Sequence, residues 1–274
     1  TIAREIGRSV ETFELFDDKR KFNIKNFSAK ADSLLEKQER LVIILNTPAH
    51  NPTGYALSDE DWRNVVNYFS SVSKEKKITL LADIAYIDFA GDEEKYRSFL
   101  PIIEEAPENV LVVIAHSLSK AYTLYGMRCG AMICMAKTEE IAAEFKRVCE
   151  FSARASWSNC PRAPQVILSK IYQDPKLKAK VDEERKGFRD MLLRRGKAFE
   201  EAAAEAGLAM VPFDAGFFAS VPCENPDALS AELEKEGIFL VPLAKGVRIS
   251  VASISEEKCR YIPGRIKACM SKIL

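Results

Sequence analysis

The segment from Ser117 to Gly130 carries the residues best suited to covalent chemistry. It reads Ser-Leu-Ser-Lys-Ala-Tyr-Thr-Leu-Tyr-Gly-Met-Arg-Cys-Gly and directly follows a buried apolar run. A lysine that forms an imine needs surroundings that suppress its charge, and Lys120 is flanked by Ser119 and an alanine. Ser117, Ser119 and Arg128 offer two hydroxyls and a fixed positive charge, which a phosphate monoester requires. The pattern indicates a reactive lysine beside a phosphate site, and a Ser/Lys loop before a surface arginine is the open alternative.

Two other segments present polar side chains immediately after apolar runs. The sequence Asn-Thr-Pro-Ala-His-Asn-Pro-Thr-Gly ends at Gly54, and its two prolines and glycine predict a rigid turn that presents Asn51. Asp83 ends the run Ile-Thr-Leu-Leu-Ala-Asp, where a carboxylate needs a cationic partner, and Tyr86 follows it. Taken alone, the first segment is also compatible with a tight strand-to-helix loop, and the second with a helix N-cap.

Arg248 lies in the middle of an apolar strand pattern, Gly-Val-Arg-Ile-Ser-Val-Ala. A charge at such a position is costly unless it is paired. The planar guanidinium group binds a carboxylate through two parallel hydrogen bonds, which lysine does not reproduce. We therefore expect either a carboxylate-binding arginine or a structural arginine satisfied within the protein.

The elements expected to position these residues alternate between strands and helices. Short apolar runs predict buried strands at residues 41–46, 78–83, 110–115 and 129–135. Helical patterns occur at residues 58–73, between the first two strands and with Ser58 as N-cap, and at residues 137–153, after the last strand. This order is typical of an α/β fold, a mostly parallel sheet with helices on both faces. Ligands of such sheets bind outside the carboxyl ends of the strands, where the polar residues collect.

The pattern changes after about residue 175. A long charged helical stretch is predicted over residues 176–206. Short strands are predicted next, at residues 208–212, 216–221, 238–241 and 247–252, with helices near 227–236 and 256–272. We therefore expect a large domain at residues 1–180 and a smaller α+β domain at residues 181–274.

Composition argues against several classes of protein. The 274 residues include 40 basic and 40 acidic side chains, so a nucleic-acid or anionic-membrane partner is not predicted. Seven cysteines without a Cys-x-x-Cys pair and only two histidines argue against a disulfide framework and a metal site. Scattered cysteines indicate a reducing, cytoplasmic compartment. No apolar run reaches the roughly 18 residues of a membrane-spanning helix.

Taken together, in this order and spacing, the segments resemble the fold-type I pyridoxal-phosphate-dependent aminotransferases of the aspartate/aromatic group, over essentially the whole chain. The resemblance implies that Lys120 forms the Schiff base with pyridoxal phosphate and shuttles the substrate α-proton, and that Asp83 pairs with the pyridine nitrogen. It also implies that Asn51 and Tyr86 bind the ring oxygen of the cofactor, and that its phosphate is bound by Ser117, Ser119 and Arg128. The substrate α-carboxylate would be bound by Arg248. By a looser match, Arg154 would reach a distal carboxylate of the substrate across a dimer interface.

The function implied by this resemblance is transamination in a homodimer. The amino group would pass from an aromatic L-amino acid or aspartate to a 2-oxo acid such as 2-oxoglutarate. A carbon–sulfur lyase, decarboxylase or acyltransferase of the same fold, or an inert fragment, is the alternative. The family's glycine-rich phosphate turn and stacking aromatic ring do not occur in these residues. The resemblance therefore implies an absent N-terminal part and an inactive 274-residue piece.

Overall fold

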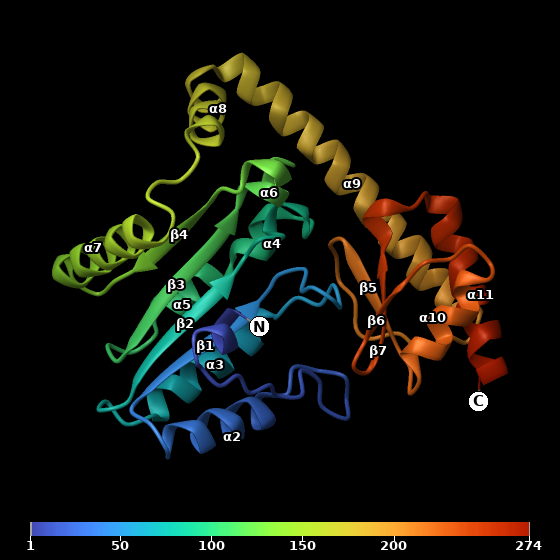
Figure 1. The fold of residues 1–274 in the computed structure, drawn as a ribbon, viewed down its shortest axis with the longest axis horizontal. Coiled ribbons are helices and arrows are strands. Elements are labelled where there is room, and N and C mark those ends of the chain that lie inside the picture. Colours follow the sequence, from blue (N-terminus) through green and yellow to red (C-terminus); the bar gives the residue numbers. More distant parts are fainter. Residues whose placement is uncertain (1, 274) are drawn as a thin grey trace.

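The first of two sheets is the expected mostly parallel one (Figure 1). The computed structural model describes residues 2–273. The strands of the first sheet lie in the order β1 (Arg40–Asn46), β2 (Lys77–Asp83), β3 (Val110–Ser117) and β4 (Gly130–Met135). β1, β2 and β3 are parallel, and β4 runs antiparallel to β3. The predicted α/β fold class is therefore confirmed.

Helices precede, connect and follow these strands. They are α1 (Ile2–Glu5), α2 (Ile24–Leu35), α3 (Asp59–Ser71), α4 (Glu93–Arg97), α5 (Phe99–Glu104), α6 (Leu118–Ala121), α7 (Glu139–Ser156) and α8 (Arg162–Gln173), with 3-10 turns η1 (Ile87–Phe89) and η2 (Tyr125–Met127). Ser58 caps α3 as predicted, because its hydroxyl accepts from Asp61 N at 3.1 Å and the Asp61 carboxylate accepts from Ser58 N at 2.9 Å.

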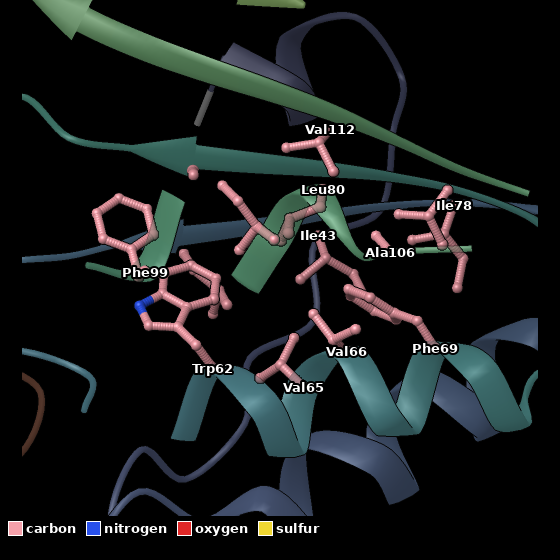
Figure 2. Close-up of a cluster of buried hydrophobic side chains, with 14 of the residues drawn as sticks. Ile43, Trp62, Val65, Val66, Phe69, Ile78, Leu80, Phe99, Ala106 and Val112 are labelled. Carbon is pink, nitrogen blue, oxygen red and sulfur yellow. The ribbon is translucent and has the colours of Figure 1, made fainter. Parts of the chain in front are cut away.

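The first hydrophobic core lies between the sheet and α3 (Figure 2). Trp62 stacks on Phe99 with ring centroids 5.0 Å apart, and Phe69, further along α3, is fully buried at the other end of the cluster in Figure 2. Alternate residues of β1 point into this core, whereas Val42 and Ile44 on the opposite face are each 63% exposed. Asn46 and Asp83 end their strands on this second, more open face.

The second sheet is small and antiparallel. Its strands lie in the order β5 (Phe218–Pro222), β7 (Gly246–Ser250) and β6 (Val241–Leu243). They pack with α10 (Pro226–Glu234), η3 (Val251–Ser253) and α11 (Glu256–Ile273). The core of this region includes Phe199, Leu229, Leu233 and Ile249, all at most 1% exposed. The expected α+β character is thus present, and a boundary at residues 180 and 181 stays a prediction.

Two of the predicted short strands are placed differently. Residues 208–212 form no strand, although Val211 N donates to Ser220 O at 3.0 Å. Pro212 follows immediately and has no backbone N–H with which to extend a ladder. The strand predicted at residues 238–241 is instead β6, which begins at Val241.

One long helix connects the two regions. α9 (Pro175–Glu205) has 31 residues and begins at Asp174, whose carboxylate accepts from Lys176 N at 2.9 Å and Leu177 N at 3.1 Å. The first half of α9 passes the first sheet and its second half packs into the second core (Figure 1). None of the helices within residues 2–273 combines the length and the apolar character needed to cross a membrane.

Candidate active site

Hydrogen bonds at the carboxyl edge of the first sheet fix Asn51 and Asp83 close together. Asn46 Nδ2 donates to Asp83 O at 3.1 Å, and Asn46 Oδ1 accepts from Asn51 N at 2.7 Å. Asp83 lies in register with Asn46 on one side and Ala115 on the other. The Asp83 carboxylate also accepts from Ala85 N at 3.1 Å. The predicted amide and carboxylate therefore share one rigid edge, as parallel strands require.

Lys120 lies on α6, a single helical turn that directly follows β3. Its Nζ is 5.8 Å from the centroid of the Tyr86 ring and 5.5 Å from the centroid of the Tyr125 ring. Both distances lie within the range of cation–π attraction. Tyr125 was not among the predicted site residues. The sequence could have indicated Tyr125 as a site residue, because it lies in the Lys120 segment, five residues after the lysine.

Tyr86 connects the first sheet with the second. It is buried, and its ring meets Phe217 and Phe218 edge-on at centroid distances of 5.3 and 5.9 Å. Burial raises the pKa of the Tyr86 phenol, although its hydrogen bond with Asn51 and the charge of Arg248 act in the opposite direction. The phenol is therefore protonated at neutral pH and can donate a hydrogen bond.

The three residues predicted to bind phosphate occupy one short segment. Arg128 Nη1 donates to Ser119 Oγ at 3.2 Å and to Tyr125 O at 2.7 Å, and Ser117 ends β3 just before α6. The return of the chain into β4 requires Gly130, because a Cβ there would lie 2.5 Å from the His116 carbonyl oxygen. A guanidinium group and two hydroxyls thus lie along the segment that carries Lys120.

Arg248 reaches the same site from β7. Its Nη1 donates to Asn51 Oδ1 at 2.9 Å, and its guanidinium carbon lies 4.3 Å from the centroid of the Phe218 ring. Within residues 2–273, Arg248 Nε is one of two buried side-chain nitrogen or oxygen atoms without a hydrogen-bond partner. A buried, unsatisfied guanidinium N–H is costly, and a carboxylate is the partner that its planar geometry matches.

Arg154 lies apart from the other predicted site residues. It is exposed on the last turn of α7, where its Nη1 donates to Ser158 Oγ at 2.5 Å. The other predicted residues gather where the carboxyl edge of the first sheet meets the second sheet. This arrangement combines an amine, a carboxylate, phosphate-type donors and a second guanidinium group.

The sequence model of the family "Aminotransferase class I and II" matches residues 1–266. The chain belongs to this family. That membership confirms the resemblance and agrees with the order in which the lysine, aspartate, asparagine and arginine segments occur.

Similar proteins agree with this assignment. The chain is 33% identical over 183 residues to the aromatic-amino-acid aminotransferase of Pseudomonas aeruginosa, covering 65% of this chain and 44% of that protein. It is 27% identical over 248 residues to the mitochondrial aspartate aminotransferase of Arabidopsis thaliana, covering 88% of this chain and 55% of that protein. The crystal structure of an aminotransferase from Anaerococcus prevotii matches with a TM-score of 0.95 at 38% identity, over 98% of this chain and 66% of that chain. The chain thus spans about half the length of the two curated relatives.

Proposed function

We propose that the complete protein is a pyridoxal-phosphate-dependent transaminase. It transfers an amino group from an aromatic L-amino acid or aspartate to a 2-oxo acid such as 2-oxoglutarate. The observation that carries the proposal is the convergence of the Lys120 amine and the Arg248 guanidinium, connected through Tyr86 and Asn51. Membership of the aminotransferase family and the names of the relatives support this choice of reaction.

The donor set matches the chemical groups of pyridoxal phosphate. Lys120 provides the amine for covalent attachment through the aldehyde, and Asp83 the carboxylate for the pyridine nitrogen. The other groups of the cofactor find partners in Ser117, Ser119 and Arg128 for the phosphate, and in Asn51 and Tyr86 for the ring oxygen. The bound cofactor supplies an electron sink that stabilises negative charge at the substrate α-carbon.

The residues of the chain have separate tasks in this reaction. Lys120 Nζ removes the proton from the substrate α-carbon and carries it during the transfer. Tyr86, a phenol that is protonated at neutral pH and whose pKa burial raises further, donates a hydrogen bond that orients the ring. Asp83, held at the edge of the sheet, keeps a negative charge in place beside the cofactor. Arg248 binds the substrate α-carboxylate, which gives its free Nε a partner.

A homodimer is part of the proposal. α7 has no buried side chain over its whole length of 18 residues, and Val148 and Phe151 on it are 58% and 78% exposed. The surface that covers such an amphipathic helix lies outside residues 2–273. A second copy of the chain would cover α7, and Arg154 at its end would reach the distal carboxylate of a dicarboxylic substrate in the neighbouring site. The scattered free cysteines support a cytoplasmic location.

A single half-reaction tests the proposed function. The complete protein, loaded with pyridoxal phosphate, is mixed with one L-amino acid at a time while absorbance is recorded. We expect an aromatic amino acid or aspartate to convert the cofactor to its pyridoxamine form with release of one equivalent of 2-oxo acid. Release of sulfide or carbon dioxide would instead indicate a lyase or a decarboxylase, and an unchanged spectrum with every amino acid would contradict catalysis.

A further inference from the structure

The carbonyl group that follows Lys120 is bound by an arginine from the connecting helix. Arg185 of α9 donates from Nε to Ala121 O at 2.8 Å. Its guanidinium carbon also lies 4.6 Å from the centroid of the Tyr122 ring. These two contacts involve the two residues that come directly after Lys120, so Arg185 restrains the chain at the point where the lysine side chain begins.

The helix that carries Lys120 needs such a restraint. α6 contains only four residues, and one turn of helix does not offset the cost of nucleating it. The last carbonyl groups of a helix have no partner within it, and a cationic donor at that end is favourable. The turn closes when Tyr122 N and Leu124 N both donate to Leu118 O, at 3.2 and 3.3 Å. Neither of these bonds satisfies the carbonyl of Ala121, which accepts from Arg185.

Arg185 is itself held in place by Asp88. Arg185 Nη2 lies 2.9 Å from Asp88 Oδ1, and the Asp88 side chain is only 11% exposed. The same carboxylate contacts Arg97 Nη2 at 3.0 Å and His116 Nε2 at 3.3 Å. Burial by itself raises the pKa of Asp88, but the hydrogen bond with His116 and the charges of Arg185 and Arg97 together lower it. Asp88 is therefore ionised at neutral pH and can orient the guanidinium group.

This carboxylate also connects the segments that carry the candidate site. Asp88 follows Tyr86 by two residues, and His116 immediately precedes Ser117. Arg185 belongs to α9, whose later part carries Phe199 into the second core. One ionised side chain thus joins the segment of Tyr86, the segment of Lys120 and the helix that extends to the second region.

We propose that Arg185, oriented by Asp88, is a positioning residue that holds the Lys120 turn in the geometry that catalysis requires. The proposal rests on the proposed function, in which Lys120 reacts. Arg185 binds main chain and not substrate, so its loss would misplace the lysine without removing any binding group. A misplacement of about 1 Å at a reacting group lowers turnover by roughly 100-fold.

Arg185→Lys in the complete protein, compared with Arg189→Lys, tests this role. Lysine keeps a positive charge for Asp88 but cannot also donate an Nε hydrogen bond to Ala121 O. Arg189 is a matched control, because it lies one turn further along α9, is similarly buried and bridges to Glu93 at 3.1 Å. Asp88→Asn is a second variant, which removes the orienting charge and keeps the shape of the side chain.

Hydrogen–deuterium exchange of the cofactor-free protein is the first measurement. We expect faster exchange of the amides of residues 118–125 in Arg185→Lys and Asp88→Asn, with no change in Arg189→Lys and none at residues 78–83 of β2. Exchange at residues 118–125 equal to that of the unmodified protein would overturn the proposal. Equal acceleration in Arg189→Lys would also overturn it, because the effect would then be a general loosening of α9.

Steady-state kinetics is the second measurement. We expect Arg185→Lys to lower kcat roughly 10- to 100-fold while KM for the amino acid is unchanged, because Arg248 is untouched. A raised KM with unchanged kcat would overturn the positioning role. Faster exchange at residues 118–125 in a protein that transaminates no amino acid would support the restraint by Arg185 and refute the proposed function. The two hypotheses therefore fail in distinguishable ways.

Discussion

The two sheets contribute to the candidate site in unequal ways. The first sheet supplies a continuous edge on which Asn51, Asp83 and Lys120 end or follow neighbouring strands, and the Asn46 side chain joins the first two by hydrogen bonds to Asp83 O and Asn51 N. The second sheet contributes Arg248 from β7 and the rings of Phe217 and Phe218. The groups assigned to the cofactor thus share one scaffold, whereas the group assigned to the substrate carboxylate comes from a separate core. We expect variants of the two regions to affect turnover and substrate capture differently.

The largest effect is expected for Lys120→Ala, which removes the amine from the first region. The variant should lose at least about 10³-fold in kcat, because the residue proposed to move the α-proton is absent. The fold should persist, since the Lys120 side chain is only partly buried and alanine is a good helix former at its position in α6. Turnover and circular dichroism of the complete protein check this. Lys95→Ala is the control, because Lys95 also lies over a tyrosine ring, that of Tyr96, and should retain activity. Comparable activity in both variants would remove Lys120 from the reaction.

A pair of core substitutions tests whether the two regions act separately. Phe69 and Phe199 are each 0% exposed, one in each core cluster. Replacing either by alanine should lower the free energy of unfolding by about 3–5 kcal/mol, because each leaves a cavity of similar size. Only Phe199→Ala should also raise KM for the amino acid, since Phe199 packs in the same cluster as Val247 and Ile249, the neighbours of Arg248.

Denaturant unfolding and steady-state kinetics of the two variants provide these values. An equal rise of KM in Phe69→Ala would mean that the substrate-binding side of the site is not confined to the second region. The division of cofactor binding and substrate binding between the two sheets would then be wrong.

The first region was also the part that the sequence predicted best. β1 was expected at residues 41–46 and spans Arg40–Asn46, because its apolar run is nearly continuous, although only alternate residues of it are buried within residues 2–273. In the second region, the strand expected at residues 208–212 was wrong. Strands of three to five residues there depend on pairing between distant segments, such as Phe218 with Ser250, which a local pattern does not contain.

α2 and α8 are the two longest of the helices that the sequence analysis did not predict, and they were missed for different reasons. α2 buries Phe27, Ala31 and Leu35, spaced four residues apart, so its signal was present and was not used. α8 buries only Pro164 and Ile171 and follows Pro161, which gives little periodicity to detect. α7, by contrast, was predicted although it buries no side chain, because its amphipathic pattern is present in the sequence whether or not a surface covers it.

The candidate site residues were predictable as segments, and their contacts were not. Asp83, Asn51 and Lys120 each end or follow an apolar run, which marks them in the sequence. The hydrogen bond between Arg248 and Asn51 joins residues 197 positions apart, and that between Arg185 and Ala121 spans 64. Contacts of this kind depend on how the two cores are placed, so only the folded chain reveals them.

Arg248→Lys should lower kcat/KM by less than Lys120→Ala does, and it changes the second region alone. The variant loses a planar pair of donors and the hydrogen bond to Asn51, which together contribute about 1.5–3 kcal/mol. We expect kcat/KM to fall roughly 10- to 100-fold, mostly through KM, while the cofactor absorbance is unchanged. Titration with amino acid measures the loss of substrate binding, and titration with cofactor measures any loss of cofactor binding. Arg128→Lys is the informative contrast, because it should weaken binding of the cofactor first.

The smallest expected effect concerns the turn where the two regions meet. His50 begins this turn, and its Nδ1 lies 2.8 Å from Thr53 Oγ1. Gly54 O accepts from Asp214 N at 3.0 Å, and Pro52 O accepts from Ser220 Oγ at 2.8 Å, so the turn supports residues of the second region. Burial lowers the pKa of His50 from 6.5 to about 4. His50 therefore becomes protonated at a lower pH in the folded protein than in the unfolded chain.

The sign of the pH effect follows from that order of protonation. Between about pH 6.5 and pH 4 the unfolded chain carries more protons at His50, so stability falls as the pH is lowered through this window. From about pH 7 to about pH 5.5, the loss attributable to His50 is about 1 kcal/mol. His50→Gln keeps a polar side chain that can bond Thr53 and has no proton to gain, so its stability should change about 1 kcal/mol less over this range. Equal pH dependence in both proteins, measured by denaturant unfolding, would mean that His50 is freely protonated in the folded state and that the contact between the two regions is open to water.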